Sequence, residues 1–197
     1  SMQKILKRAR LGAVEGLDGY DFSIRPQLDP RIVKEFPSGH FIEEHRNVLC
    51  LGKPGTGKTR VRKALGRAAC ALGYTVLYVI FAEMLDALHA SRADGTFIRT
   101  LRRYIKPQLL LIDEFAYEGV SLDATKDLFR LVSARHRQGS IVLAANTGFS
   151  RWAKLFPTEA AAVATVDRLV DDATILRFTG KSGRPPRDIV GAPLEDE

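Results

Sequence analysis

The chain has 197 residues, 45% of them hydrophobic, which is enough for the core of one large domain or two small ones. Its net charge of +7 and pI of about 9.6 favour a polyanionic partner such as DNA over a small metabolite, although a charge that only aids solubility is the alternative. The sequence shows no run of 18 apolar residues and no signal peptide, so we expect a cytoplasmic protein with no membrane partner.

The first part of the chain is predicted to be helical. Residues 3–11 have the pattern of a short basic amphipathic helix. Asp29-Pro30 marks the start of a second helix, with Asp as N-cap and Pro in the first turn, which ends near Phe36-Pro37. A short helix near 39–46 then leads into the first strand. We expect residues 1–46 to form a helical lead-in to the main domain.

Apolar runs alternate with amphipathic segments over the rest of the chain, which predicts strands alternating with helices. Because each strand is a continuous apolar run, we expect an α/β domain with a parallel sheet of about five strands covered on both faces, a three-layer core over residues 47–180. Residues 181–197 are rich in Gly and Pro and are expected to form a tail. The predicted strands are 47–51, 74–81, 109–112, 140–145 and 173–178, and the predicted helices are a segment ending at residue 72, 82–92, 96–105, 122–137, 149–155 and 159–171.

The most informative stretch is the octapeptide 52–59, GKPGTGKT, which matches the full phosphate-loop pattern G-x-x-x-x-G-K-[ST]. It lies between a predicted strand and a predicted helix, an arrangement that directs backbone N–H groups at phosphate oxygens. Lys58 is expected to reach the β- and γ-phosphates, and the Thr59 hydroxyl to bind Mg²⁺. A glycine-rich turn that binds nothing is the alternative. The predicted nucleotide-binding residues are Gly52, Pro54, Gly55, Thr56, Gly57, Lys58, Thr59 and Arg60.

Two carboxylates follow the predicted strand at 109–112, at the end where open α/β sheets bind ligands. Asp113 is expected to hold Mg²⁺, and Glu114 to polarise the water that attacks the γ-phosphate. Without the phosphate loop, an N-cap and a solvated charge would be the simpler interpretation. The Asn-Lys-x-Asp motif that reads guanine is absent, so we expect ATP as the nucleotide.

Asn146 and Arg168 have two interpretations each. Asn146 follows the predicted strand 140–145, where its amide can orient the attacking water or simply form a turn. Arg168 can stabilise transition-state charge in a neighbouring subunit, or it can be an ordinary surface arginine.

Cys50 and Cys70 are predicted to be buried and unbridged, as in a reducing cytosol. The histidines show no metal-site spacing, so Mg²⁺ is the only metal that we expect.

The order of these motifs resembles the IstB-like AAA+ ATPases, helpers of bacterial DNA transposition that are related to the DnaC helicase loaders. The resemblance covers nearly all of residues 3–190, and its most specific part is Phe149-Ser150-x-Trp152. It implies a P-loop NTPase core of the AAA+ type without a C-terminal helical lid. It also implies that Asn146 is sensor 1 and that Arg168 is an arginine finger acting in trans.

The resemblance further implies a sensor-2 role for Arg184. Gly183 stands where the family usually has Tyr, so Arg187 is the competing assignment. The family usually has an additional N-terminal helical region, of which only the last basic helix is recognisable, so we expect a trimmed or short relative.

The function implied by the resemblance is ATP hydrolysis with Mg²⁺ in a DNA-bound homo-oligomer that recruits or activates a transposase in the bacterial cytoplasm. The first alternative is a DnaC-like loader for a replicative helicase. The others are a P-loop kinase for a small metabolite, and a nucleotide-gated binding module with negligible turnover.

Three groups of basic residues are candidates for DNA contacts, although each can also be a solvated face. The neighbouring aromatic residues have the pattern of core residues, so we expect phosphate contacts and no base reading. The groups are Arg92, Arg99, Arg102 and Arg103 in the helical segments between two strands; Lys126, Arg130, Arg135 and Arg137 on a second helix; and Lys4, Lys7, Arg8 and Arg10 near the N-terminus.

Overall fold

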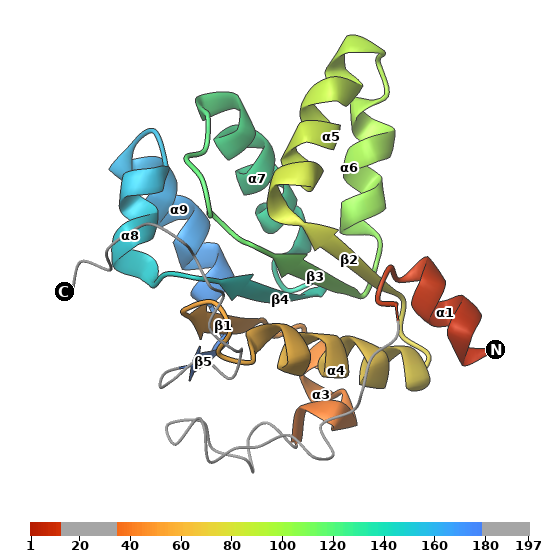
Figure 1. Cartoon of the computed structure of the whole chain (residues 1–197). Coiled ribbons are helices and arrows are strands. Elements are labelled where there is room, and N and C mark those ends of the chain that lie inside the picture. Colours follow the sequence, from red (N-terminus) through yellow and green to blue (C-terminus); the bar gives the residue numbers. More distant parts are fainter. Residues whose placement is uncertain (13–34, 179–197) are drawn as a thin grey trace, which may run out of the picture.

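A computed structural model describes residues 1–12 and 35–178 of the chain (Figure 1). The helix predicted to start at Asp29-Pro30 lies outside the described residues, except for its last part. That part is the short 3₁₀ helix η2 (Phe36–Ser38). Arg184, Arg187 and the expected tail also lie outside the described residues, as does any segment that could form a lid.

Five parallel strands form a single sheet in the order β2-β3-β4-β1-β5. This confirms the predicted parallel α/β sheet. The strand predicted at 74–81 is shorter than expected, because pairing with β3 begins at Val76 and Phe81 already starts the next helix. The strands are β1 (Val48–Gly52), β2 (Val76–Ile80), β3 (Leu109–Asp113), β4 (Ser140–Ala145) and β5 (Thr174–Phe178).

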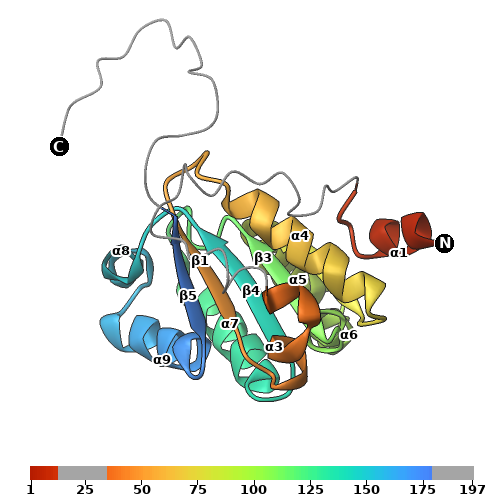
Figure 2. The same cartoon turned by 90° about the horizontal axis from the view of Figure 1, so that it is seen from below.

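Helices cover both faces of the sheet, as Figures 1 and 2 show from two directions. Along β1, Leu49 and Leu51 enter one hydrophobic core while Val48 and Cys50 enter the other. This two-sided burial explains why the strands are continuous apolar runs. One face carries α1 (Met2–Arg8), α3 (His40–Glu43) and α4 (Lys58–Ala71); the other carries α5 (Phe81–Ala93), α6 (Phe97–Ile105), α7 (Leu122–Arg135), α8 (Phe149–Leu155) and α9 (Glu159–Val170).

The basic helix α1 is shorter than the predicted 3–11 helix and packs onto the domain core. Ala9 and Leu11, just after it, are buried in the core that also contains residues of α4. The Tyr78 N–H donates to the Ala9 carbonyl over 2.9 Å, which fixes this segment beside the edge strand β2. The exposed basic side chains of α1 therefore lie next to the β2 edge of the sheet.

Arg135 corrects one prediction, that it belongs to a basic surface of α7. Its side chain is only 1% exposed. The guanidinium donates to carbonyls at the end of α6, in the segment after it and at the start of β4. An arginine with five N–H donors is suited to satisfy such orphan carbonyls. Burial lowers the pKa of Arg135 to about 10. The accepting carbonyls belong to Tyr104, Ile105, Pro107, Gln108 and Ser140.

Both cysteines are buried and unbridged, as predicted. Burial raises the pKa of Cys50 to about 12, although the positive charges of Arg62 and Lys58 oppose this rise. Burial raises the pKa of Cys70 as well. Because thiolates are the reactive form, we expect the folded protein to react very slowly with an aromatic disulfide reagent at pH 8.

The same reagent should titrate both thiols promptly once the chain is unfolded in guanidinium chloride. The measurement is the absorbance of released thiolate with time. Stoichiometric reaction of one thiol within the mixing time of the native sample would contradict the burial described here.

Candidate nucleotide-binding site

Three predicted motifs meet at the carboxyl edge of the sheet. The phosphate loop follows β1, the carboxylate pair ends β3, and Asn146 follows β4. Since β4 lies between β3 and β1, Asn146 comes between the phosphate loop and the carboxylates. Figure 2 shows the ends of these strands side by side. This is the edge at which open parallel sheets bind their ligands.

The phosphate loop depends on glycine at its two ends. Gly52 has φ 154°, and a Cβ built on it would lie 2.1 Å from the Phe178 carbonyl oxygen, so no other residue fits against β5 there. Gly57 has φ 92° and is the N-cap of α4, a left-handed conformation that favours glycine. The loop therefore delivers the chain directly into the N-terminus of α4, where backbone N–H groups can bind an anion.

Lys58 and Thr56 hold the loop together from inside. The Lys58 side chain is buried, and its ammonium group donates to the carbonyls of Gly52 and, over 2.7 Å, Lys53. The Thr56 hydroxyl donates to the same Lys53 carbonyl over 2.6 Å. The loop thus curls around a positive charge at a helix N-terminus, an arrangement suited to phosphate groups.

The carboxylate of Asp113 is held on both oxygens. Its Oδ2 accepts from the Arg62 guanidinium over 2.8 Å and from the Tyr78 hydroxyl over 3.0 Å. Its Oδ1 accepts from the Glu114 N–H over 2.9 Å. Burial is the main cause that raises the pKa of Tyr78, which keeps this hydroxyl a donor at neutral pH.

Sequence reasoning missed Arg62 and Tyr78. Arg62 is fully buried in α4, and its guanidinium lies 4.7 Å from the centre of the Tyr78 ring. The signal that could have found it is its position between Val61 and Leu65, on the side of the helix predicted to face the core. A charged residue on such a face needs a buried partner, and a carboxylate on an adjacent strand is the natural one.

Hydroxyl and carboxylate oxygens are the ligands that Mg²⁺ prefers, so Thr59 and Asp113 suit this metal by their chemistry. Among the described residues there is no group of three or more His, Cys, Asp or Glu that could hold a metal without further ligands. The nucleotide's own oxygens would have to complete the coordination. Any metal here would also share Asp113 with Arg62.

The backbone of Glu114 is strained. Its φ is 53°, a left-handed value that is uncommon for residues other than glycine, and its side chain is exposed at the carboxyl edge. The next residue, Phe115, is buried between the rings of Phe81 and Trp152, each centred 4.6 Å away. This packing fixes the turn in which Glu114 lies, and such strain persists only where the surroundings enforce it.

The Phe149–Trp152 stretch supports that turn from α8. Trp152 is fully buried, and its ring also meets the Phe149 ring edge-on at 4.9 Å. The Phe115 N–H donates to the Ala144 carbonyl, which ties the end of β3 to the end of β4 just before the half-buried Asn146. The most specific part of the resemblance thus has a structural role beside the predicted catalytic carboxylate.

Arg168 lies far from the phosphate loop of its own chain. The carbonyl of the next residue, Leu169, accepts from the Asn47 side chain, and Asn47 immediately precedes β1. Arg168 is therefore at the amino edge of the sheet, whereas the loop begins five residues further along β1. At about 3.3 Å per strand residue, this separation is about 16 Å.

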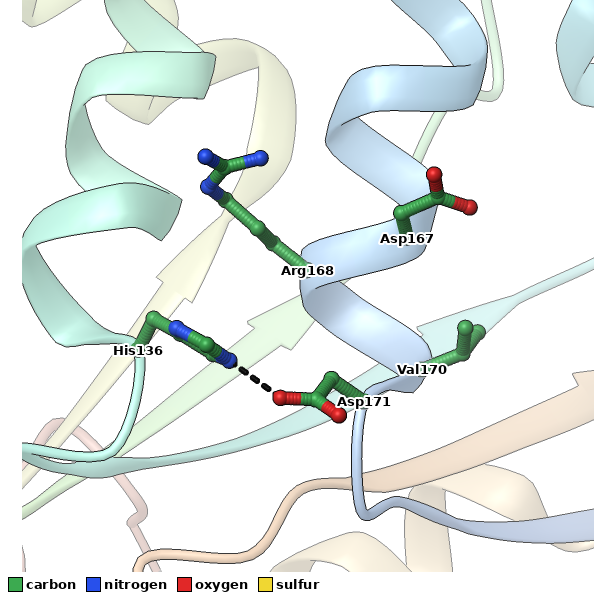
Figure 3. Close-up of a pocket in the computed structure, with 5 residues that line it drawn as sticks. All are labelled: His136, Asp167, Arg168, Val170 and Asp171. Carbon is green, nitrogen blue, oxygen red and sulfur yellow. Dashed lines mark hydrogen bonds and ion pairs between the residues drawn. The ribbon is translucent and has the colours of Figure 1, made fainter.

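Figure 3 shows the pocket around Arg168, at the ends of α7 and α9. The Arg168 guanidinium lies 4.7 Å from the Phe129 ring centre, while His136 and Asp171 pair with each other and close the other side. The hydrogen bond from His136 is the main cause that lowers the pKa of Asp171. Arg168 is thus held by stacking and is partly open to solvent.

The basic residues predicted to contact DNA have different surroundings. Arg92 pairs with the buried Asp127 and stacks on Phe97, so it has a structural task of its own. Burial raises the pKa of Tyr104 in α6, and the positive charges of Arg103 and Arg10 oppose this rise, so both arginines lie on the same side of the molecule as Tyr104. Besides Arg92, the exposed basic side chains among the predicted residues are Lys4, Lys7, Arg8, Arg10, Arg99, Arg102, Arg103, Lys126, Arg130 and Arg137.

No helix in residues 1–12 and 35–178 is both long and apolar enough to cross a membrane.

Comparison with known proteins gives consistent results. Over 183 residues the chain is 33% identical to the ATP-binding protein of insertion sequence IS21 from Pseudomonas aeruginosa, covering 93% of this chain and 69% of that protein. The crystal structure of DnaI superposes with a TM-score of 0.71 at 18% identity, covering 89% of this chain and 93% of that one. The crystal structure of the DnaC helicase loader superposes with a TM-score of 0.66 at 15% identity, covering 83% of this chain and 96% of that one.

The chain therefore has the same α/β fold as DnaI and the DnaC helicase loader, with a phosphate loop after its first strand. The family described as "IstB-like ATP binding protein" matches residues 1–188, and this chain belongs to that family.

Proposed function

We propose that this chain hydrolyses ATP with Mg²⁺ while assembled on DNA, and that the ATP-bound assembly recruits or activates a transposase. The observation that carries the proposal is the convergence of the phosphate loop, Asn146 and the Asp113-Glu114 pair at one edge of the sheet. In this proposal Lys58 and the α4 N-terminus bind the phosphates, and Thr59 and Asp113 bind the metal. Glu114 removes a proton from the attacking water, which Asn146 orients.

The position of Arg168 supports assembly as part of the function. An arginine at the amino edge of the sheet is too far from its own phosphate loop to touch a γ-phosphate there. If it stabilises transition-state charge, it does so in the site of a neighbouring subunit. Hydrolysis would then depend on contact between subunits.

The charge distribution supports DNA as the surface for assembly. The chain carries a net charge of +7, and α6 exposes Arg99, Arg102 and Arg103 beside the basic N-terminal segment. These side chains can neutralise backbone phosphates without reading bases. The similarity to an insertion-sequence ATP-binding protein favours a transposase over a helicase as the protein partner.

Lys58→Ala is expected to weaken ATP binding by about a hundredfold or more, because it removes a buried charge that faces the phosphates. The measurement is titration of a fluorescent ATP analogue by anisotropy. Lys53→Ala is the matched control, since Lys53 lies in the same loop with an exposed side chain and should bind nearly as well as the original chain. Undiminished affinity in the Lys58 variant would refute the assignment of the loop.

Assembly is tested by light scattering with a non-hydrolysable ATP analogue, duplex DNA, both, or neither. We expect particles larger than one subunit only where the analogue and DNA are both present, and none for Lys58→Ala. A pull-down of the assembled protein against a transposase and against a replicative helicase then identifies the partner. Retention of the helicase alone would favour the loader function, and a monomer under all conditions would contradict the proposal.

A further inference from the structure

Arg62 is a buried charge with little compensation besides Asp113. Its guanidinium is inaccessible to solvent, and Nη2 lies 2.8 Å from Asp113 Oδ2. Neither Nε nor Nη1 has a hydrogen-bond partner within the described part of the chain. The face of the Tyr78 ring offers a weaker, additional contact at 4.7 Å. The stability of this guanidinium in the core therefore depends on the carboxylate that the proposed function assigns to Mg²⁺.

This dependence sets a competition. Drawing Asp113 fully toward a metal would leave a buried, uncompensated guanidinium, and breaking one side of a buried ion pair is strongly unfavourable. The Tyr78 hydroxyl, which donates to the same Oδ2, adds to the hold on this oxygen. Arg62 and Tyr78 therefore already neutralise most of the negative charge that Asp113 could offer to a metal.

We propose that Arg62 is a positioning residue that competes with Mg²⁺ for the carboxylate of Asp113, so that this site binds a nucleoside triphosphate with little help from the metal. The inference rests on the proposed function, because it takes the loop at 52–59 as the triphosphate site. It concerns the metal dependence of binding, which the proposed function leaves open.

The charges around the loop are the reason to expect binding without a metal. The Lys58 ammonium lies inside the phosphate loop at the N-terminus of α4, and Arg62 neutralises the carboxylate of Asp113. A triphosphate therefore meets a cationic site even without a metal. If Arg62 were neutral, Asp113 would be an uncompensated anion close to the phosphates, and only a divalent cation would relieve the repulsion.

The test measures the dissociation constant of a fluorescent, non-hydrolysable ATP analogue in EDTA and in Mg²⁺. For the original chain we expect Mg²⁺ to tighten binding by less than about fivefold, the lower end of typical coupling between two ligands. Arg62→Met keeps the volume of the side chain and removes its charge. For this variant we expect the ratio of the dissociation constant in EDTA to that in Mg²⁺ to rise by about tenfold or more, mainly through weaker binding in EDTA.

Two further variants separate charge competition from general damage. Tyr78→Phe removes a hydrogen bond but keeps the ion pair, so its ratio should stay within about threefold of the original. The double variant Arg62→Met, Asp113→Asn removes both charges and should lose the increase seen with Arg62→Met alone, because coupling is measured by such a cycle.

The outcomes are distinct. A ratio above about fivefold in the original chain, or an unchanged ratio in folded Arg62→Met, overturns the inference while leaving nucleotide binding intact. If Arg62→Met does not fold, the original chain and the double variant decide, because the double variant leaves no unpaired buried charge. An original ratio below about fivefold that changes by less than about threefold in the double variant supports the competition, whereas a rise of about tenfold or more in the double variant overturns it. Failure of the original chain to bind the analogue in either buffer overturns the proposed function as well.

Discussion

Arg168→Ala is expected to lower the ATPase rate of the DNA-bound assembly by about 10³-fold, while the affinity for ATP is nearly unchanged. The affinity is expected to persist because Arg168 lies at the amino edge of the sheet, whereas its own loop begins about 16 Å further along β1. The rate is expected to fall because an arginine finger acts on charge that develops only in the transition state. The measurement is phosphate release at protein concentrations that give assembly by light scattering.

Mixing two inactive variants tests whether Arg168 acts between subunits. A Glu114→Gln subunit keeps ATP binding and an intact Arg168 but lacks the proposed base, and an Arg168→Ala subunit has the reverse. If the arginine serves a neighbour, mixed assemblies should regain activity at the junctions where an intact Glu114 site meets an intact arginine. Activity that stays at the level of the separate variants, although mixed particles form, would show that Arg168 has no such role. In that case the stacking on Phe129 would be its whole function.

The sequence predicts the fold well because the strands are simple signals. Each strand of a parallel sheet is buried on both faces, so each appears as an uninterrupted apolar run, and the alternation with helices follows directly. The positions of the phosphate loop, Asp113 and Asn146 at one edge follow from the parallel arrangement alone. Strand ends were less certain, as in β2, because pairing with the neighbouring strand decides them.

The sequence could not predict the partners of charged residues. Arg135 and Arg62 both belong to helices that also carry exposed basic residues, and periodicity, even where it places an arginine on the core-facing side of a helix, does not say which carboxylate or carbonyl that arginine meets. In the folded chain Arg135 satisfies the carbonyls at the end of α6, and Arg62 satisfies Asp113. These pairings join residues 30–51 positions apart, so only the tertiary structure reveals them.

The strained turn after β3 was equally hidden. No rule of sequence predicts a left-handed glutamate, since the conformation is enforced by Phe115 packing between Phe81 and Trp152. Trp152 comes from a helix almost forty residues further along the chain. The turn therefore joins the carboxylate motif to the Phe149–Trp152 stretch, which the sequence presents as two separate features.

Glu114→Gln is expected to lower ATP hydrolysis by about 10³-fold and to leave ATP binding unchanged. Glutamine has the same shape and can keep the strained turn, but its amide cannot accept the proton of the attacking water. The measurements are phosphate release and the affinity for a fluorescent ATP analogue. DNA-bound particles of this variant should persist with ATP itself, since the nucleotide that favours assembly is not consumed.

Glu118→Gln is the matched control for this prediction, because Glu118 lies on the same segment after β3 with an exposed side chain. It removes the same charge four residues away, and its hydrolysis rate should remain close to that of the original chain. Equal losses in both variants would mean that the net charge of the segment matters more than a base at one position. A selective loss with Glu114→Gln, together with persistent particles, would identify Glu114 as the base and ATP hydrolysis as the step that ends assembly.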